Sequence, residues 1–115
     1  MKILFVHQNF PGQFLHLAPE LQARGHDCRA LTAATNRRPS PIPTLRYAFD
    51  PAAVDPAATR LGRNFTANSD RGVAAARAAL RMRAEGYVPD VIFGHSGWGE
   101  TLFLKEVWPA ARLIV

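Results

Sequence analysis

The chain has 115 residues, of which 48% are hydrophobic and 20% are charged, a balance typical of one globular domain with a single core. Its apolar runs are far shorter than the roughly 20 residues that a membrane-spanning helix needs. The run after Met1 is also too short for a secretory signal. The sequence therefore predicts one soluble, cytoplasmic domain over residues 1–115.

Basic side chains outnumber acidic ones by fourteen to nine, which gives a formal net charge of +5, and twelve of the fourteen are arginines. This charge suits partners that carry phosphate groups or anionic surfaces. We expect no specific nucleic-acid partner, because no zinc, helix-turn-helix or base-stacking motif accompanies the charge. The single cysteine, Cys28, has no disulfide partner in the chain and is predicted to be a buried thiol.

Three strands are predicted in the first half of the chain. Lys2 to Val6 is a nearly continuous apolar run, typical of a parallel strand that is buried on both faces. Cys28 to Thr32 follows as a second strand, and Leu45 to Phe49 alternates apolar and polar residues like an exposed third strand. Three prolines between Asn36 and Thr44 predict an extended loop before the third strand.

A helix is predicted between the first two strands, because apolar residues recur there at helical spacing and Arg24-Gly25 provides a basic last turn with a glycine stop. Pro19 falls inside this helix. Either the helix kinks at Pro19, or a new helix begins with Pro19 in its first turn. The apolar residues at helical spacing are Phe14, Leu17, Ala18 and Leu21.

The longest helix is expected to begin at a cap formed by Ser69 or Asp70 and to end at Glu85, before Gly86. Helical spacing predicts a buried stripe on it, and its arginines are expected on another, solvated face. The predicted buried residues are Val73, Ala76 and Leu80. The stretch around Pro51 and Pro56, which precedes this helix, is predicted to be irregular or to form short helical turns.

The remaining elements are a short buried strand at Val91 to Phe93, a helix from Thr101 to Val107 that Pro109 ends, and a fifth strand that opens at Arg112. Strands that alternate with helices indicate an α/β fold, a Rossmann-like doubly wound parallel sheet with the strand order 3-2-1-4-5. The chain ends on three apolar residues inside the fifth strand, so we expect it to be truncated there.

In such a sheet, ligands bind outside the carboxyl ends of the strands where the strand order reverses, here between strands one and four. The loop after strand one, His7 to Gln13, contains Gly12, where backbone amides can approach a polar ligand. The loop after strand four, Gly94 to Glu100, places a histidine, a hydroxyl, an indole and a carboxylate among three glycines. Glu100 either complements the dipole of the next helix or contacts a ligand.

Several nucleotide-binding and catalytic classes are excluded by these loops. Neither G-x-G-x-x-G nor G-K-[ST] follows strand one, so a dinucleotide-binding domain and a P-loop are disfavoured. A phosphoaspartate receiver domain would require an acidic residue at the end of strand one. This strand ends in His7, so that class is disfavoured. Ser96 lacks the spacing of a nucleophile elbow, and no histidine pair has metal-ligand spacing, so neither a hydrolase triad nor a metal site is expected.

Five segments together resemble the N-terminal domain of family 4 glycosyltransferases with the GT-B fold. They are Met1 to Phe14, His16 to Pro19, Arg24 to His26, Pro89 to His95 and Gly97 to Thr101. The resemblance covers nearly the whole chain, and residues 36–68 contribute little to it. It implies an enzyme in which a first domain binds mostly the acceptor and a second, absent here, binds mostly the nucleotide-sugar donor.

By this resemblance the parent enzyme transfers a sugar from a nucleotide-sugar donor to a sugar or lipid-linked acceptor, with retention of configuration and without a metal or other cofactor. The fragment alone is expected to be inactive. His95 is the candidate catalytic residue, close to the transferred sugar, and Gly12 and Gln13 would line the cleft near the acceptor and the donor phosphates. The candidate substrate-binding residues are Asn9, Gly12, Gln13, Ser96 and Glu100.

Three other hypotheses are compatible with the sequence. The first is a noncatalytic α/β module that binds a phosphorylated or sugar ligand with the same two loops. The second is peripheral docking on anionic lipid at the inner face of the membrane. The third is self-association of the fragment into a homodimer through its exposed fifth strand and cleft face. The arginines of the lipid hypothesis are Arg60, Arg63, Arg71, Arg77, Arg81 and Arg83.

Overall fold

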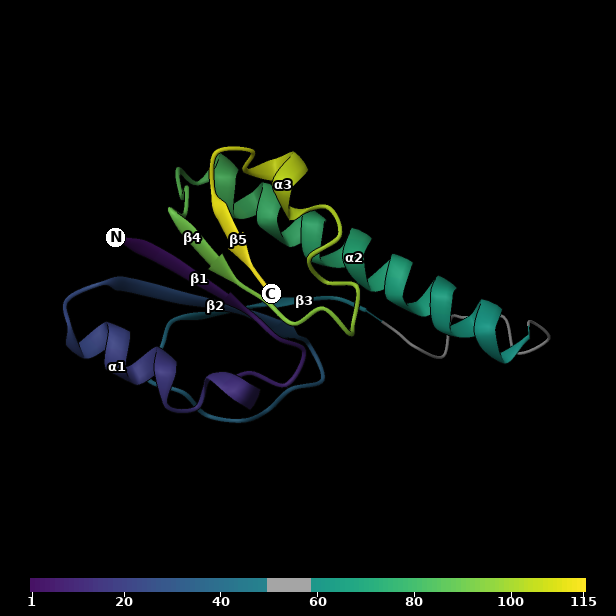
Figure 1. The fold of residues 1–115 in the computed structure, drawn as a ribbon, viewed down its shortest axis with the longest axis horizontal. Coiled ribbons are helices and arrows are strands. Elements are labelled where there is room, and N and C mark those ends of the chain that lie inside the picture. Colours follow the sequence, from purple (N-terminus) through teal and green to yellow (C-terminus); the bar gives the residue numbers. More distant parts are fainter. Residues whose placement is uncertain (50–58) are drawn as a thin grey trace.

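A parallel five-stranded sheet with helices on both faces forms the domain (Figure 1). The computed structural model describes residues 1–49 and 59–115. The strand order is β3-β2-β1-β4-β5 and every neighbouring pair is parallel, so the predicted doubly wound order is confirmed. The strands are β1 (Lys2–Val6), β2 (Asp27–Ala33), β3 (Thr44–Tyr47), β4 (Val91–Phe93) and β5 (Arg112–Ile114).

The segment between β1 and β2 contains a 3-10 turn, η1 (Gly12–Phe14), and a separate helix, α1 (Leu17–Ala23). Pro19 is the third residue of α1, so it lies in the first turn, where a helix needs no backbone N–H donor. Of the two alternatives for Pro19, the structure therefore has the new helix and not the kink. Gly25 follows the helix with a φ of +91°, as expected of a glycine stop.

The longest helix, α2 (Arg60–Ala84), begins earlier than predicted. Its N-cap is Thr59, whose side-chain oxygen accepts a hydrogen bond from the Gly62 N–H at 3.0 Å, so the predicted cap at Ser69 or Asp70 was wrong. Residues 60–69 contain no proline, and their one glycine, Gly62, lies in the first turn, so the helix extends back to Thr59. The amino-terminal half of α2 consequently projects beyond the sheet (Figure 1).

Two of the three predicted buried residues of α2 were also wrong, while the third, Ala76, is partly buried and packs against the core. Val73 and Leu80 are 38% and 43% exposed. Small side chains face the sheet instead, because they allow the helix to approach closely; a Cβ atom at Gly72 would lie 2.6 Å from the Gly99 carbonyl oxygen. The buried residues of α2 are Gly72, Ala75, Ala78, Ala79 and Met82.

The last helix is shorter than predicted: α3 spans Leu104–Val107, and residues 101–103 form turns before it. The third strand likewise ends at Tyr47, before the predicted end at Phe49. The predictions for Pro51 and Pro56 fall on residues 50–58, outside the described residues. Among the residues that the structure describes, no helix is both long and apolar enough to cross a membrane.

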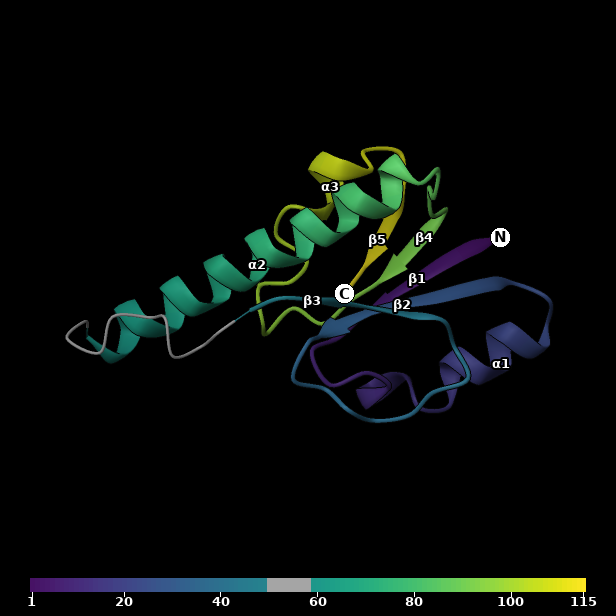
Figure 2. The same ribbon diagram turned by 180° about the vertical axis from the view of Figure 1, so that it is seen from behind.

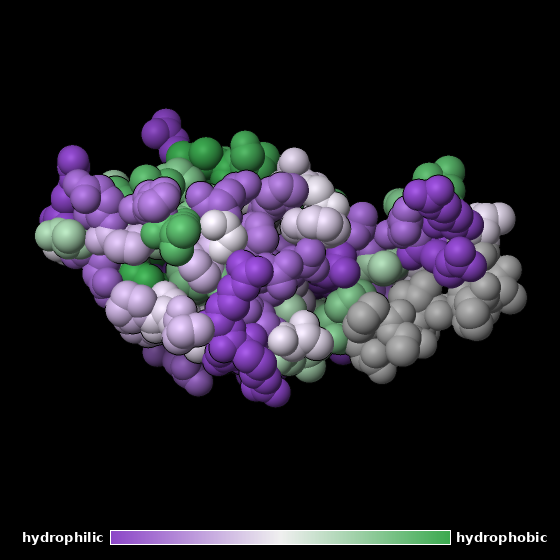
Figure 3. All heavy atoms as spheres, turned by 90° about the horizontal axis from the view of Figure 1, so that it is seen from below, coloured by the Kyte–Doolittle hydropathy of each residue, from purple (hydrophilic) through white to green (hydrophobic). Residues whose placement is uncertain are grey.

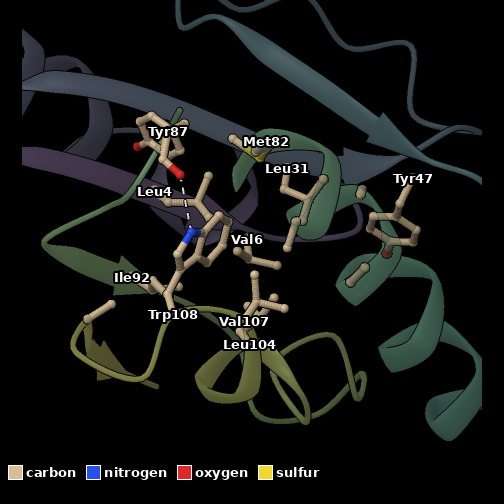
Figure 4. Packing of buried hydrophobic residues seen from close by; sticks show 14 of the residues in the cluster. Leu4, Val6, Leu31, Tyr47, Met82, Tyr87, Ile92, Leu104, Val107 and Trp108 are labelled. Carbon is tan, nitrogen blue, oxygen red and sulfur yellow. Dashed lines mark hydrogen bonds between the residues drawn. The ribbon is translucent and has the colours of Figure 1, made fainter. Parts of the chain in front are cut away.

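Each face of the sheet has its own hydrophobic core. Side chains alternate along β1, so that Leu4 and Val6 pack against α2 and α3 while Ile3 and Phe5 pack on the side of α1. Figure 4 shows the first core, where the Trp108 indole N–H donates to the Tyr87 carbonyl oxygen at 3.2 Å.

Helices α2 and α3 cover one face of the sheet and α1 covers the other, which is clear from both sides of the molecule (Figures 1 and 2). The outer surface on the side of α1 is mainly hydrophilic (Figure 3). Cys28 is buried on this side, as predicted, at 3% exposure, and burial raises the pKa of its thiol. Both layers thus place apolar side chains against the sheet and leave its carboxyl edge to polar loops.

Candidate functional site

The two polar loops start side by side at the carboxyl edge of the sheet. Strands β1 and β4 are paired neighbours, with Phe5 opposite Phe93, so the loop His7 to Gln13 and the loop Gly94 to Glu100 leave the same point. This is the place where the strand order reverses, and it is the expected location of a ligand in an open parallel sheet.

Two buried polar side chains at the end of β2 hold the first loop in place. The Thr32 hydroxyl donates to the Gln8 carbonyl oxygen at 3.0 Å and accepts from the Phe10 N–H at 3.2 Å. The Asn36 amide nitrogen donates to the Phe10 carbonyl oxygen at 2.7 Å and to the Thr32 hydroxyl at 2.9 Å. These bonds satisfy the loop backbone where it is withdrawn from water.

His7 lies beneath Gly12 and is 9% exposed. A Cβ atom at Gly12 would be 2.6 Å from the Cε1 atom of His7, and Gly12 has a φ of +47°, so only glycine fits there. The ring centroids of His7 and His95 are 5.6 Å apart, with the rings at 80° to each other. The two loops therefore meet at the imidazole of His7.

His95, the candidate catalytic residue, is half-buried and is fixed on two sides. Its Nδ1 atom accepts a hydrogen bond from the Gly97 N–H at 2.9 Å. Its ring is stacked on the Trp98 indole, with centroids 5.8 Å apart at 26°. Because Nδ1 is the acceptor, the proton of the neutral ring is on Nε2, which can donate to a ligand oxygen.

Glu100 is completely buried and joins the two loops to the edge of the sheet. One carboxylate oxygen accepts from the Gln8 N–H at 3.1 Å and the other accepts from the Tyr47 hydroxyl at 2.7 Å. Burial raises the pKa of Glu100, although these two hydrogen bonds and the charge of Arg71 oppose the increase. Helix α3 starts only at Leu104, so Glu100 does not complement the dipole of that helix.

The predicted site residues separate into three groups by exposure. Asn9, Gln13 and Ser96 are exposed, and Gly12 and His95 are partly exposed, so ligands can reach all five. Glu100 is 0% exposed and contacts only protein groups. In this structure Glu100 therefore holds the loops in position through its hydrogen bonds to Gln8 and Tyr47.

Sequence reasoning missed the residues that organise these loops. They lie at or near the carboxyl ends of β1, β2 and β3 and on α2. The signal for three of them was a polar residue within three positions of the end of an apolar strand. The tyrosine and the arginine gave no local signal, because their partners are far along the chain. These residues are His7, Thr32, Asn36, Tyr47 and Arg71.

Arg71 fastens the second loop to α2. Its guanidinium donates to the Trp98 carbonyl oxygen at 2.9 Å and to the Asn68 side-chain oxygen at 2.9 Å. The guanidinium carbon also lies 4.6 Å from the ring centroid of Phe49. A groove between α2 and the loop is lined by Asn64, Asn68, Arg71 and Trp98, among others.

Chemically, the accessible part of the site offers hydrogen-bond donors and no accessible carboxylate from the two loops. The described residues also contain no cluster of three or more histidine, cysteine or acidic side chains that could hold a metal ion. Neutral imidazole N–H groups and backbone amides suit oxygen-rich ligands such as phosphates and sugars.

The open parallel sheet with two polar loops at its switch point defines a Rossmann-like α/β domain. A family model described as "Glycosyl transferase family 4 group" matches residues 24–115. The chain belongs to this family, and the resemblance drawn from its sequence is confirmed.

Among solved structures, the crystal structure of the glycosyltransferase SnogD from Streptomyces nogalater is similar to this chain, with a TM-score of 0.50 and 21% sequence identity. The similarity covers 82% of this chain and 27% of the SnogD chain, so this chain spans about a quarter of that protein's length. At this identity the likeness concerns the fold. A search of curated proteins found no match.

Proposed function

We propose that this chain supplies the acceptor-side loops of an enzyme that transfers a sugar from a nucleotide-sugar donor to an acceptor, with retention and without a metal. The bond from the anomeric carbon to the diphosphate breaks and a bond to the acceptor oxygen forms, while the acceptor proton leaves with the nucleoside diphosphate. Membership in a glycosyltransferase family and the position of His95 at the switch point support this proposal.

His95 carries the proposal. Its ring is partly exposed, and the Gly97 N–H and the Trp98 indole fix its orientation. The Nε2–H group would donate to a hydroxyl of the transferred sugar or to the charge that develops as the nucleotide leaves. Such fixed donors act without reorganisation during the reaction, and the loss of one typically costs about 100- to 1,000-fold in rate.

The groove beside Trp98 favours a sugar as the acceptor. The exposed part of the indole, beside the stacked ring of His95, provides an apolar surface for the C–H groups of a sugar. The Asn64 and Asn68 amides can both donate and accept hydrogen bonds. This combination of an aromatic ring and amides suits a molecule that has an apolar face and a polar rim.

The test is a donor screen on the full-length protein, with UDP-, GDP- and dTDP-linked hexoses. The readout is the release of the nucleoside diphosphate, which includes transfer to water and so needs no known acceptor. We expect turnover of at least one donor and a loss of about 100-fold or more in His95→Ala. His16→Ala is the matched control, because His16 is exposed and lies outside the two loops.

Two results would contradict the proposal. The first is the absence of turnover with every donor in the screen. The second is a His95→Ala protein that releases the nucleotide as fast as the His16→Ala control. Unchanged urea unfolding of His95→Ala would show that a loss of rate is not a loss of fold.

A further inference from the structure

His7 is a second imidazole inside the proposed site that the proposed reaction does not yet use. Its ring lies against the ring of His95 in the second loop and beneath Gly12 in the first. It also lies beside the ring of Phe14 in η1, at a centroid distance of 6.2 Å. Phe14 belongs to the core on the side of α1. His7 is thus held on one side by the hydrophobic core, while His95 lies beside it and is partly exposed to solvent.

The backbone fixes both histidines in the same tautomer. The Asn9 N–H donates to Nδ1 of His7 at 3.0 Å, and the Gly97 N–H donates to Nδ1 of His95 at 2.9 Å. In each case the donor lies two residues further along the chain. Since a neutral imidazole has one proton, Nε2 carries it in both rings.

Protonation of His7 would break this arrangement, because a hydrogen on Nδ1 would oppose the Asn9 N–H. Burial, the neighbouring His95 and the charge of Arg38 lower the pKa of His7 in the same direction. His7 is therefore suited to donate a hydrogen bond from Nε2 and not to accept a proton.

The Nε2 atoms of both rings have no hydrogen-bond partner within residues 1–49 and 59–115. The carboxylate of Glu100 does not serve them, since both its oxygens are bound to Gln8 and Tyr47. Two N–H donors thus lie on rings whose centroids are 5.6 Å apart and have no acceptor among the described residues, so oxygens of one ligand could accept from both.

We propose that His7 is a second substrate-contacting residue, whose Nε2–H donates a hydrogen bond to an oxygen of the same substrate molecule that His95 contacts. The inference rests on the proposed function, because it takes His95 as a substrate contact. The oxygen belongs either to a phosphate of the donor or to a hydroxyl of its sugar, and the two sources are separable by experiment.

The direct test is nuclear magnetic resonance on the chain with ¹⁵N-labelled histidine, which gives a simple spectrum because the sequence has only four histidines. Long-range ¹H–¹⁵N correlations report the tautomer of each ring. We expect Nε2–H tautomers for His7 and His95 in the free protein. An Nδ1–H tautomer at His7 would overturn the proposal without any ligand.

The probes are inorganic pyrophosphate, UDP-glucose and GDP-mannose. Any probe that shifts the Nε2 resonance of His95 should also shift that of His7, while His16 and His26 stay unchanged. If pyrophosphate is sufficient to shift the two resonances, the contact is to a phosphate oxygen. If only a nucleotide sugar shifts them, the contact is to the sugar. A probe that moves His95 and leaves His7 unchanged overturns this inference alone, whereas the failure of every probe to move either ring in the full-length protein counts against the proposed function as well.

Two substitutions separate the ligand contact from a structural role. His7→Asn retains an oxygen near the position of Nδ1 that can accept from the Asn9 N–H, but it lacks the Nε2–H donor. We expect wild-type unfolding in urea and about three- to tenfold weaker binding of the probe that moves His95, the usual effect of one lost hydrogen bond. His16→Asn serves as the control. Undiminished affinity in a folded His7→Asn protein would refute the contact.

Discussion

The hydroxyl of Tyr47 donates a 2.7 Å hydrogen bond to Glu100, and together they tie the outer strand β3 to the end of the second loop. Both side chains are 0% exposed. The two residues are 53 positions apart in the sequence, so this bond closes the carboxyl edge of the sheet only in the folded state. It links the position of the loops to the stability of the domain.

Removal of the Tyr47 hydroxyl should destabilise the protein. Tyr47→Phe leaves a buried carboxylate oxygen without its donor, which typically costs about 1–3 kcal/mol. Tyr87 provides the matched comparison, since its buried hydroxyl has no hydrogen-bond partner in the described part of the chain. Tyr87→Phe should therefore be neutral or stabilising. Urea unfolding of both variants checks the expected difference in sign, and an equal loss in both would contradict it.

The stability of the domain should depend on pH through Glu100. Burial raises the pKa of this carboxyl, so the folded state keeps the proton to a higher pH than the unfolded chain does. Stability is therefore full below the ordinary pKa of glutamate and decreases as the pH rises from there through the raised value. Glu100→Gln has no proton to lose and should not show this decrease.

The measurement is the free energy of unfolding in urea as a function of pH for the wild type and for Glu100→Gln. The lowered pKa of His7 gives an opposite slope at higher pH, because the unfolded chain binds that proton more readily. This contribution is present in both proteins and cancels in their difference. A difference between the two proteins that does not change with pH would show that Glu100 titrates alike in both states.

Gly99 should tolerate alanine much less than Gly86 does. Both have positive φ, +80° and +91°, and so share the backbone cost of about 1–2 kcal/mol. A Cβ atom at Gly86 meets nothing within 4 Å, whereas one at Gly99 would collide with the backbone of Asn68 in α2. Gly99→Ala should lose more stability and also shift the His95 resonances. Equal losses of stability in the two variants would show that the positive φ accounts for the whole effect and that the contact with Asn68 adds nothing.

Substitutions on α2 test which face packs on the sheet. Leu80→Ala should change the free energy of unfolding by less than about 1 kcal/mol, because this side chain is 43% exposed. Ala79→Leu should destabilise by about 1–3 kcal/mol, because Ala79 is fully buried and a larger side chain does not fit. If the stripe expected from the sequence were the buried one, Leu80→Ala would lower the free energy of unfolding in urea more than Ala79→Leu does.

The strand pattern and order were predictable because continuous apolar runs such as Lys2–Val6 leave few ways to build a sheet. The packing face of α2 was not predictable in this way. Hydropathy favours Val73 and Leu80 as buried residues, but the close contact between the helix and the sheet has room only for small side chains such as alanine. The two loops were predicted from their composition. Their supports were not, since bonds such as that of Tyr47 to Glu100 join residues that no local pattern connects.

Helix α2 is fastened to the segment after β4 at two separate points. Arg71 donates to the Trp98 carbonyl oxygen and Arg83 donates to the Val107 carbonyl oxygen, at 2.9 and 3.0 Å. The two arginines are about three helical turns apart, so the helix can neither slide nor rotate without breaking both bonds. The part of α2 that extends beyond the sheet is therefore joined to the second loop through Arg71. Through this bond the helix holds the backbone of Trp98, the residue on whose indole the His95 ring is stacked.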